Sequence, residues 1–513
     1  MESLSGAPGS ARAGALTAAV IVVLAIAISG CGSSSSSGES ANLTGSGYPG
    51  VDAANTRNPS SQIDSSNVSS LGVAWTAPIT GTSNFGSYAS TPVIDKGVIY
   101  SQDLASNVQA LSLDSGEALW TKNYSQPDEG PNGVVVAGGR VFGATPTEAF
   151  ALDQKTGKQV WSVVLPRNEH EGIDMAPGYH DGMVYVSTVP LNANESYEGG
   201  GVGILWALDA KTGKKLWHFN TVPNSLWGNP KVNSGGGVWY PPAFDEKGFM
   251  YFGTGNPAPY PGTPEFPSGT SRPGPNLYTN SLVKLNAKTG KLKWYHQVTP
   301  HDLYDWDFQG PPILIKAGGR QVVVAAGKSG IVLAADPETG KVIWQRAIGK
   351  HNGHDDDGLL AMRGEASKIK VGTLYPGTLG GVIAPMSTDG STVFAPVVNY
   401  PGKVISGSEV SEGGEAGGEV VALDAATGKV KWTEKLSTPA YGATTAVNDL
   451  VFATNYEGSV SALDAKTGQV VWREKLPAGT NSGVMADGEM LIAPAGLAAA
   501  AGQTPKIVAY KLE

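Results

Sequence analysis

The residues with the clearest chemical potential in this chain are three aspartates in the segment TPHDLYDWDFQGPP. Asp302, Asp305 and Asp307 fall within six residues and are separated by aromatic side chains. In a strand, Asp305 and Asp307 would share one face because side chains alternate with a period of two. Carboxylates crowded among aromatic rings are costly unless a cation or a hydrogen-bond donor compensates them. The pattern predicts a metal or catalytic site, and a solvated turn is the alternative.

A second acidic group stands beside two histidines in the stretch HNGHDDDG. It contains His351, His354 and the run Asp355-Asp356-Asp357, which resembles a metal cluster by composition. No partner residues with recognisable ligand spacing accompany it. We therefore expect a solvated loop here.

Cys31 is the only cysteine in the chain, and its position carries information. It follows Arg12 and an apolar run over 16–29 that has the length of a signal-peptide core and is too short for a membrane-spanning helix. The run ends Ile-Ser-Gly-Cys, which resembles a bacterial lipobox, so Cys31 is the predicted site of lipidation. The alternative is an uncleaved anchor with an incidental cysteine. A single cysteine also excludes internal disulfides and a Cys-x-x-Cys-His haem-attachment motif.

We accordingly expect a lipoprotein signal peptide over 1–30 and a Ser/Gly-rich tether over 31–48. The folded part would then lie outside the cytoplasmic membrane, held to the membrane through its lipid anchor.

The elements that must position the candidate side chains come from an internal repeat. Seven copies of a phrase such as ALDAKTGKKLW end at a tryptophan, and Trp75 closes an eighth copy that lacks the turn. The seven are Trp120, Trp161, Trp217, Trp294, Trp344, Trp432 and Trp472. Repeats at this spacing are typical of propellers and solenoids, in which each unit buries its core against its neighbours.

Each phrase reads as a hairpin. An apolar strand leads into Asp-x-x-Thr-Gly, whose glycine takes a positive φ, and the second strand alternates polar and apolar residues up to the tryptophan. Tryptophan brings a large apolar area and one N–H donor, which suits the docking of one blade on the next.

The two ends of the chain complete the count. The C-terminal KIVAYKLE has only the first half of the phrase, and the segment of Trp75 has only the second half. If they pair, the last blade closes the ring and leaves few free sheet edges. We predict an all-β fold, an eight-bladed β-propeller over 49–513.

Charge and composition exclude some functions. The chain has 36 Lys and Arg against 45 Asp and Glu, with a net charge of −9 and no basic run. We therefore expect no nucleic-acid partner. The spacing between phrase tryptophans is longest before Trp217, Trp294 and Trp432, so the extra residues must leave the blades as loops, where functional residues concentrate.

With these motifs in view, the chain resembles the pyrroloquinoline quinone (PQQ) dependent alcohol and sugar dehydrogenases, which are eight-bladed quinoproteins. The opening segment YPGVDAANTRNPSSQIDSSNVSSLGVAW and the repeated phrase are similar to those of the family. The repeat alone is also found in non-enzymatic propellers, including an outer-membrane assembly lipoprotein. FGTGNPAPY and TPHDLYDWDF resemble the family's site segments more specifically.

The resemblance implies a set of metal ligands. Asn256 of FGTGNPAPY corresponds to a ligand asparagine, and Glu198 matches the family's ligand glutamate by spacing, with Glu195 as a rival. Asp305 corresponds to the catalytic aspartate, which also binds the metal. Asp307 corresponds to a further carboxylate found in lanthanide-using members and in the sugar-oxidising branch. The implied cofactors are PQQ and Ca²⁺, with a lanthanide as the alternative.

The resemblance also implies contacts to the quinone. Lys328, in AAGKSGIVLAAD, would stabilise charge that develops on a quinone oxygen, and Trp239, in GGGVWYPPAFD, would stack on the planar cofactor. Asn399, in VFAPVVN, falls where the family has another polar contact. Asp305 would accept the alcohol proton, and the cation would polarise the reactive carbonyl.

Some family features are missing. There are no adjacent cysteines, and Asn132 stands in the stretch where the family often has an arginine. The resemblance implies a lipid-anchored dehydrogenase of a small alcohol or sugar that passes electrons to a separate cytochrome or quinone. The alternative is a non-catalytic propeller that serves as a protein-binding scaffold in the cell envelope.

Overall fold

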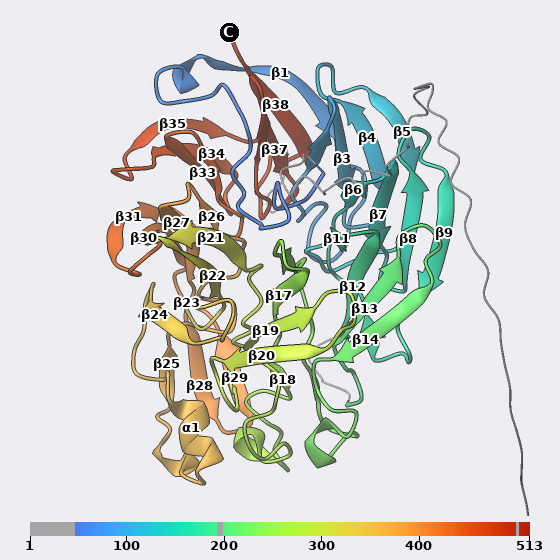
Figure 1. The fold of residues 1–513 in the computed structure, drawn as a ribbon. Coiled ribbons are helices and arrows are strands. Elements are labelled where there is room, and N and C mark those ends of the chain that lie inside the picture. Colours follow the sequence, from blue (N-terminus) through green and yellow to red (C-terminus); the bar gives the residue numbers. More distant parts are fainter. Residues whose placement is uncertain (1–46, 192–198, 499–501) are drawn as a thin grey trace, which may run out of the picture. The chain divides into compact units, whose positions relative to one another are not determined.

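The strands of this protein form a ring of eight antiparallel sheets, the blades of a propeller (Figure 1). The structure is a computed structural model that describes residues 47–191, 199–498 and 502–513. Within these residues the sheets follow one another in chain order around the ring. The predicted all-β, eight-bladed β-propeller is confirmed.

The first four blades contain 17 of the strands. Blade 1 consists of β2 (Val93–Asp95), β3 (Val98–Gln102), β4 (Val108–Ser112) and β5 (Ala118–Lys122). Blade 2 consists of β6 (Val135–Ala137), β7 (Arg140–Ala144), β8 (Glu148–Asp153) and β9 (Gln159–Val164). Blade 3 consists of β10 (Glu171–Gly172), β11 (Gly178–His180), β12 (Met183–Pro190), β13 (Ile204–Asp209) and β14 (Lys215–Asn220). Blade 4 consists of β16 (Ala243–Phe244), β17 (Phe249–Gly253), β19 (Ser281–Asn286) and β20 (Leu292–Gln297). β1 (Leu71–Pro78), which precedes these strands in the sequence, belongs to blade 8.

The other four blades have four strands each. Blade 5 consists of β21 (Ile313–Ala317), β22 (Arg320–Ala326), β23 (Ile331–Ala335) and β24 (Val342–Ala347). Blade 6 consists of β26 (Ser387–Thr388), β27 (Thr392–Asn399), β30 (Gly417–Asp424) and β31 (Val430–Leu436). Blade 7 consists of β32 (Thr445–Val447), β33 (Leu450–Asn455), β34 (Ser459–Asp464) and β35 (Val470–Lys475). Blade 8 consists of β36 (Met485–Asp487), β37 (Met490–Ala495), β38 (Lys506–Leu512) and β1 (Leu71–Pro78).

Blade 8 closes the ring with strands from both ends of the chain, as predicted. β1 pairs antiparallel with β38 from Leu71 opposite Leu512 to Pro78 opposite Lys506. The pairing covers the edge that either strand would otherwise leave open.

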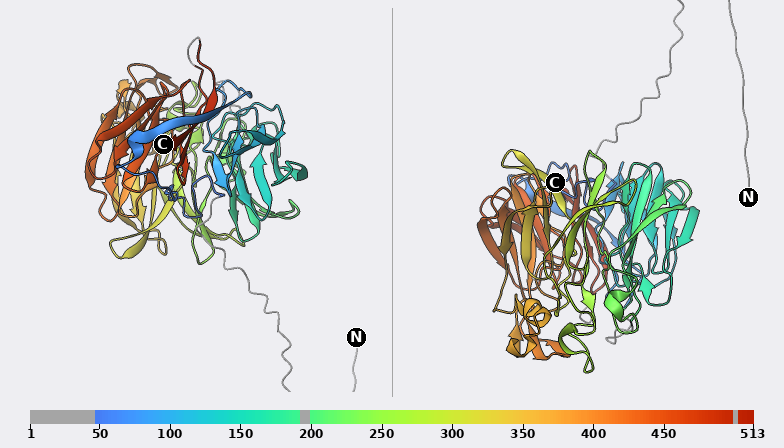
Figure 2. Two further views of the ribbon diagram at one scale, coloured as in Figure 1. Left: turned by 90° about the horizontal axis from the view of Figure 1, so that it is seen from above. Right: turned by 60° about the horizontal axis from the view of Figure 1, so that its bottom comes forward.

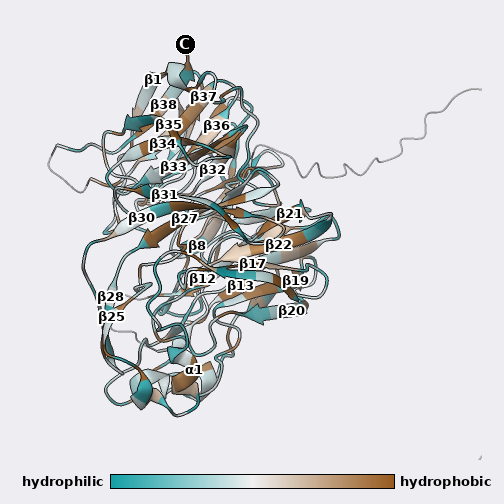
Figure 3. Cartoon of the chain, turned by 90° about the vertical axis from the view of Figure 1, so that its left-hand side faces the viewer, coloured by the Kyte–Doolittle hydropathy of each residue, from teal (hydrophilic) through white to brown (hydrophobic). Residues whose placement is uncertain are grey.

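The middle strands of each blade are buried and the outer strand is partly exposed. In blade 4, five of the six residues of β19 are buried, whereas those of β20 are exposed or half-buried. Figure 3 shows the same contrast as brown on β19 and teal on β20. The apolar first half of each phrase therefore makes the core between blades.

Every phrase tryptophan except Trp472 docks on the turn of the following blade, as its shape and single donor led us to expect. The indole Nε1 of Trp344 donates to the carbonyl of Ala425 at 3.0 Å, and the ring lies against Gly428 of the same turn. Equivalent bonds join Trp75 to Leu113, Trp120 to Gln154, Trp161 to Ala210, Trp217 to Ala287, Trp294 to Pro337 and Trp432 to Ala465. Trp472 meets the ring of Tyr510 in blade 8 edge-on.

The outer strands depart from the predicted unbroken alternation. In blade 3, Ala207 lies opposite Trp217 while Leu208 lies opposite Lys215, so one residue bulges out just before the tryptophan. The same shift recurs in the other blades. A bulge turns the following side chain, and here it turns the indole toward the next blade.

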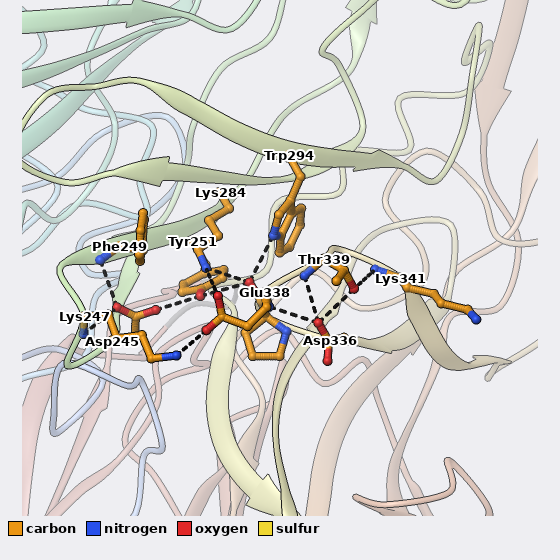
Figure 4. A network of polar contacts seen from close by, with 11 residues as sticks. Asp245, Lys247, Phe249, Tyr251, Lys284, Trp294, Asp336, Glu338, Thr339 and Lys341 are labelled. Carbon is orange, nitrogen blue, oxygen red and sulfur yellow. Dashed lines mark hydrogen bonds and ion pairs between the residues drawn. The ribbon is translucent and has the colours of Figure 1, made fainter.

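Blades 4 and 5 add a buried lysine to this joint (Figure 4). Lys284 replaces the alanine found in most phrases, and its ammonium donates to the carbonyl of Pro337 at 2.7 Å. The ammonium also lies 4.2 Å from the centre of the Phe249 ring, a cation–π contact. Burial lowers the pKa of Lys284, against the opposing charge of Glu338. The Pro337 carbonyl also accepts from Trp294, so one acceptor joins two side chains of blade 4 to blade 5.

The segment that precedes β1 runs along the inner edges of the blades. Its carbonyls accept hydrogen bonds from blades 4, 5, 6 and 7 in turn, at Ala53, Ala54, Thr56 and Arg57. Arg57 also donates to the carbonyl of Thr444 at 2.8 Å and is 2% exposed. The segment thereby ties consecutive blades together.

Insertions leave the blades, as the uneven repeat spacing predicts. The largest lies between blades 5 and 6 and contains α1 (Asp357–Met362), η4 (Ala366–Lys368) and β25 (Gly372–Leu374). β25 forms a small sheet with β28 (Gly402–Ser406) and β29 (Glu409–Glu412), which lie in a second insertion between β27 and β30 of blade 6. Smaller elements elsewhere are η1 (Val68–Ser70), η2 (Leu226–Gly228), β15 (Ser234–Gly235), β18 (Pro257–Ala258) and η3 (Pro267–Gly269). Figure 2 shows α1 projecting beyond the blades.

None of the helices in the described residues combines the length and the apolar character that crossing a membrane requires.

Candidate functional site

The aspartate-rich segment forms an irregular buried loop rather than a strand. Asp302 accepts the backbone N–H groups of Tyr304 at 3.0 Å and Trp306 at 2.7 Å, so this carboxylate holds its own loop together. Asp305 adopts a φ of +59°, in the left-handed region. That conformation is uncommon for a residue other than glycine and persists only where the surroundings impose it.

Lys328 brings the other two aspartates together. It follows β22 in blade 5, and its Nζ lies 2.7 Å from Asp305 Oδ2 and 2.5 Å from Asp307 Oδ2. The backbone N–H of Lys328 also donates to the carbonyl of Asp307 at 2.8 Å. Asp307 is 1% exposed, so this group is nearly dry. A strand is therefore not needed for the two carboxylates to face one partner.

Asn256 joins the group through its backbone. Its N–H donates to Asp307 Oδ1 at 2.7 Å, and its side-chain Nδ2 donates to the carbonyl of Pro257. The amide oxygen of Asn256 is thus the end of the side chain turned away from that carbonyl. Gly255 permits the approach, because a Cβ there would lie 2.8 Å from Asp307 Oδ1 and 3.1 Å from Trp239 Nε1.

Trp239 and Lys328 both line a large cavity of about 1000 Å³. The indole Nε1 of Trp239 is buried and has no hydrogen-bond acceptor among the described residues. A buried donor of this kind fits a ligand or water that brings an acceptor.

The electrostatics of the group follow from its burial. Burial raises the pKa of Asp305 well above its ordinary value, although Lys328 opposes the shift. Burial also works against the ammonium of Lys328, but the two carboxylates outweigh it and raise its pKa. Lys328 therefore stays charged, and Asp305 is a stronger proton acceptor than an exposed aspartate.

The remaining predicted residues do not join this group. Asn399 lies at the end of β27, where its side chain accepts the N–H of Lys350 at 2.8 Å and donates to Glu419 at 3.1 Å. Its contact to a cofactor stays a prediction. Glu198, with its rival Glu195, and Cys31 lie outside the described residues.

The donors that converge fit the implied groups in part. Asp305, Asp307 and the amide of Asn256 are oxygen ligands of the kind that calcium prefers. Within the described residues no cluster of three or more His, Cys, Asp and Glu side chains could hold a metal by itself. A cation bound by Asp305 and Asp307 would therefore also need the amide oxygen of Asn256 and further ligands beyond the described residues. The metal roles of Glu198, Asn256, Asp305 and Asp307 stay predictions.

An acid pair at the side of the cavity was not foreseen. Asp128 and Asp174 are 3% and 2% exposed, and burial raises the pKa of both. Their neighbour Glu129 lines the cavity. Asp128 belongs to the loop between blades 1 and 2, and Asp174 to blade 3. Nothing in the two local sequences signals the contact.

The histidine-and-aspartate stretch was predicted to be a solvated loop, and this is wrong for two of its residues. His354 and Asp357 are 5% and 4% exposed. Asp357 Oδ2 accepts the hydroxyl of Tyr304 at 2.5 Å and lies 2.6 Å from His354 Nδ1. The insertion between blades 5 and 6 is thereby fixed to the residue directly before Asp305. The missed signal was Tyr304, which needs a buried partner for its hydroxyl.

Comparison with known families agrees with this architecture. The profile described as the glucose/ethanol/alcohol dehydrogenase β-propeller domain, named PQQ, matches residues 48–134 and 173–348, together just over half of the chain. A second profile, described as outer membrane protein assembly factor BamB, matches residues 104–236 and 398–513.

Three known proteins illustrate the similarity. A quinohemoprotein alcohol dehydrogenase of Pseudomonas putida is 33% identical over 329 residues, which are 57% of this chain and 45% of that protein. A quinoprotein alcohol dehydrogenase of Pseudomonas putida is 27% identical over 473 residues, 78% of this chain and 76% of that protein. The solved quinohemoprotein alcohol dehydrogenase of Comamonas testosteroni has a TM-score of 0.78 at 24% identity, covering 93% of this chain and 81% of that one.

The solved structure, the curated relatives and the family profile support different conclusions about this chain. The solved structure shows the fold alone at this identity. The chain spans about half the length of most of the curated relatives that it matches. The profile match covers the opening segment, blade 1, nearly all of blade 3, blades 4 and 5, and both site segments around Asn256 and Asp305. The chain therefore belongs to the PQQ family of glucose/ethanol/alcohol dehydrogenase β-propeller domains.

Proposed function

We propose that this protein is a PQQ-dependent dehydrogenase that oxidises an alcohol or a sugar and passes the electrons to a separate acceptor. The observation that carries the proposal is the convergence of Asp305, Asp307 and Lys328 beside the cavity that Trp239 lines. Family membership and the names of the relatives, which are quinoprotein and quinohemoprotein alcohol dehydrogenases, support the same assignment.

The side chains have distinct tasks in this proposal. When bound, the quinone accepts two electrons and the cation acts as a Lewis acid. Asp305 accepts the proton of the substrate hydroxyl at its carboxylate, for which burial has prepared it. Lys328 neutralises negative charge that develops beside its ammonium, and Trp239 provides a flat apolar wall.

The cation would be held by oxygen atoms. Asn256, Asp305 and Asp307 would contribute from the described residues, and Glu198 from outside them. We propose calcium, which takes six to eight oxygen ligands, ahead of a lanthanide. Asp307 already accepts from Asn256 and contacts Lys328, so the charge of this third carboxylate is shared with protein donors.

The proposal also covers the electron acceptor and the cellular location of the protein. We propose that a separate cytochrome or quinone receives the electrons. The sequence around Cys31 supports a lipid-anchored protein outside the cytoplasmic membrane, and mass spectrometry of the mature N-terminus would test the anchor. An unmodified Cys31 in membrane fractions would contradict it.

The decisive experiment is reconstitution. Purified protein is mixed with PQQ and either calcium or lanthanum, and the absorbance of bound quinone and the reduction of a dye are measured with a panel of alcohols and sugars. We expect quinone binding and dye reduction in the wild type, and quinone binding with at least about a hundredfold slower reduction in Asp305→Asn. Absence of any spectral change with either metal would sink the proposal.

A second function follows from the other family profile. The match to outer membrane protein assembly factor BamB covers two parts of the chain, and it favours a propeller that binds protein partners in the cell envelope. Failure of reconstitution together with co-purification of envelope proteins would favour this alternative.

A further inference from the structure

Part of the lining of the large cavity consists of apolar and aromatic side chains, three of which are exposed. We call the set of Phe85, Leu379, Tyr441, Tyr456 and Leu497 the aromatic rim; all five line the cavity. Phe85 is 52% exposed, Tyr456 is 42% exposed and Leu379 is 39% exposed. Exposed apolar groups gathered at a concave site mark a place where an apolar ligand is bound.

The aromatic rim is braced rather than loose. Phe85 lies at the tip of a tight turn in which Ser83 and Gly86 exchange backbone hydrogen bonds. Gly86 packs so closely on Leu497 that an added Cβ would lie 2.7 Å from its side chain. The following residue, Ser87, donates its N–H to Gly496 at 2.8 Å. The backbone that carries Phe85 is therefore fixed beside the cavity.

The other half of the aromatic rim comes from the loop between blades 6 and 7, from blade 7 and from the insertion before blade 6. The rings of Tyr441 in that loop and Tyr456 in blade 7 meet edge-on, with centroids 5.7 Å apart. The hydroxyl of Tyr441 donates to the carbonyl of Leu379 at 3.3 Å, which joins the loop to the insertion. The tyrosine rings thus present fixed faces to the cavity.

The charges around the cavity exclude anionic ligands. Among the described residues that line it, Lys328 is the only basic side chain, and it is engaged by Asp305 and Asp307. Glu129 and Glu412 also line the cavity, and neither forms an ion pair with a described residue. A carboxylate or phosphate on the ligand would meet these glutamates without a free cation to offset them.

The size of the cavity and the apolar part of its lining disfavour short alcohols and sugars at the aromatic rim. The cavity of about 1000 Å³ would also hold the quinone, and a one- or two-carbon alcohol beside it would leave the aromatic rim uncovered. A sugar placed against the aromatic rim would bring hydroxyls against Phe85, Leu379 and Leu497, which offer no side-chain hydrogen bonds to replace those to water.

We propose that the substrate is a bulky, uncharged alcohol whose aromatic or branched apolar body lies against the aromatic rim while its hydroxyl reaches the ion pair of Asp305 and Lys328. This inference deepens the proposed function, because it names the class of alcohol that the dehydrogenase would oxidise. An aromatic body gains contact with Phe85, Tyr441 and Tyr456 at ring-to-ring distances that favour edge-on or offset stacking.

Binding can be measured apart from turnover. The full-length protein without added quinone is titrated in a calorimeter with 2-naphthalenemethanol, 2-naphthoate, glucose and ethanol. We expect the naphthyl alcohol to bind at least about tenfold more tightly than the other three, which corresponds to about 1.4 kcal/mol. Glucose or naphthoate binding as tightly as the naphthyl alcohol would overturn the proposal.

Variants locate the binding. Phe85→Ser and Tyr456→Ser are each expected to weaken naphthyl-alcohol binding by about three- to tenfold. Tyr295→Ser is the matched control, because Tyr295 is 40% exposed on β20 and does not line the cavity. Glu412→Gln is expected to strengthen naphthoate binding. Rim variants that bind like the wild type would also overturn the proposal.

Adding PQQ and calcium to the same samples separates this inference from the proposed function. Dye reduction that follows the order of binding supports both. Naphthyl-alcohol binding without dye reduction supports the ligand class and counts against the dehydrogenase alone. Dye reduction with glucose or ethanol, and none with the naphthyl alcohol, overturns the ligand class alone.

Discussion

Lys328 illustrates how single side chains set the chemistry of this protein. Its ammonium lies within 2.7 Å of the buried carboxyl groups of Asp305 and Asp307. Removing the ammonium would leave two buried carboxyl groups without a cation, and the backbone N–H that Asn256 donates to Asp307 offsets only part of that loss.

We expect Lys328→Met to lower the free energy of unfolding of the metal-free protein by about 3–5 kcal/mol. Lys328→Arg keeps the positive charge, so its free energy of unfolding should fall much less. Urea unfolding measures the difference, and Lys155→Met on an exposed turn is the control. A loss below about 1 kcal/mol in Lys328→Met would mean that the carboxylates find another partner.

The Asp128–Asp174 pair makes a different prediction, which concerns pH. Burial raises the pKa of both groups above the ordinary value of 3.8. As pH rises through the interval between the ordinary and the raised values, the unfolded chain loses protons that the folded chain keeps. Folding stability therefore falls as pH increases across that interval.

Asp174→Asn removes one of the two titrations while it preserves the shape of the side chain. We expect the variant to match the wild type near pH 4 and to be more stable by about 1 kcal/mol or more at pH 8. Urea titrations at the two pH values test this, with the exposed Asp114→Asn as the control. A variant that is less stable at pH 8 would show that the Asp174 charge is compensated in the folded state.

At the scale of elements, neighbouring blades are joined by the same arrangement of bulge, tryptophan and turn around most of the ring. An outer strand bulges, its tryptophan turns toward the next blade, and the indole donates to a carbonyl of the next Asp-x-x-Thr-Gly turn. The glycine of that turn has a positive φ and no side chain, so it accommodates both the turn and the ring.

Gly428→Ala tests the joint between blades 5 and 6. The new Cβ would lie 2.4 Å from Cε3 of Trp344 at a φ of +67°. Gly97 is the matched control, because it has a similar φ of +75° and nothing within 4 Å of an added Cβ. We expect Gly97→Ala to cost about 1 kcal/mol and Gly428→Ala at least about 1 kcal/mol more in thermal or urea unfolding. Equal losses would show that the indole moves aside without cost.

At the scale of the whole molecule, the ring depends on a pairing between its two ends. β1 has its backbone partners in β38 along its length, and β38 also pairs with β37. Removing β38 would expose two strand edges and the cores on both sides of blade 8.

We expect a chain that stops before Lys506 to aggregate or to lose cooperative unfolding, as judged by size-exclusion chromatography and circular dichroism. Lys511→Ala is the control, because it keeps the strand and removes only an exposed ion pair with Glu489, worth at most about 1 kcal/mol. A soluble truncated chain with a single sharp transition would contradict the dependence on closure.

Much of this architecture was predictable because short stretches of consecutive residues determine it. Trp344 and the turn at Gly428 each belong to a repeated phrase, so the blades, their number and their docking can be read without the structure. Asp305, Asp307 and Asn256 were nominated by short motifs, and the structure brings them together at Lys328.

The features that were missed depend on contacts between distant residues. Asp128 meets Asp174 across two blades, and Tyr304 meets Asp357 across a whole blade. Asn399 has a neighbour in Glu419 that no local pattern signals. Such pairs form only once the ring exists, and nothing in either local sequence distinguishes them from solvated residues.

The closure of blade 8 has a consequence for biosynthesis. β1 is the first and β38 the last of the described strands, so the other blades can assemble during synthesis while this one waits. A chain interrupted before β38 keeps an unpaired strand edge, which makes an incomplete chain prone to aggregation. Blade 8 can therefore close only after translation has passed Leu512.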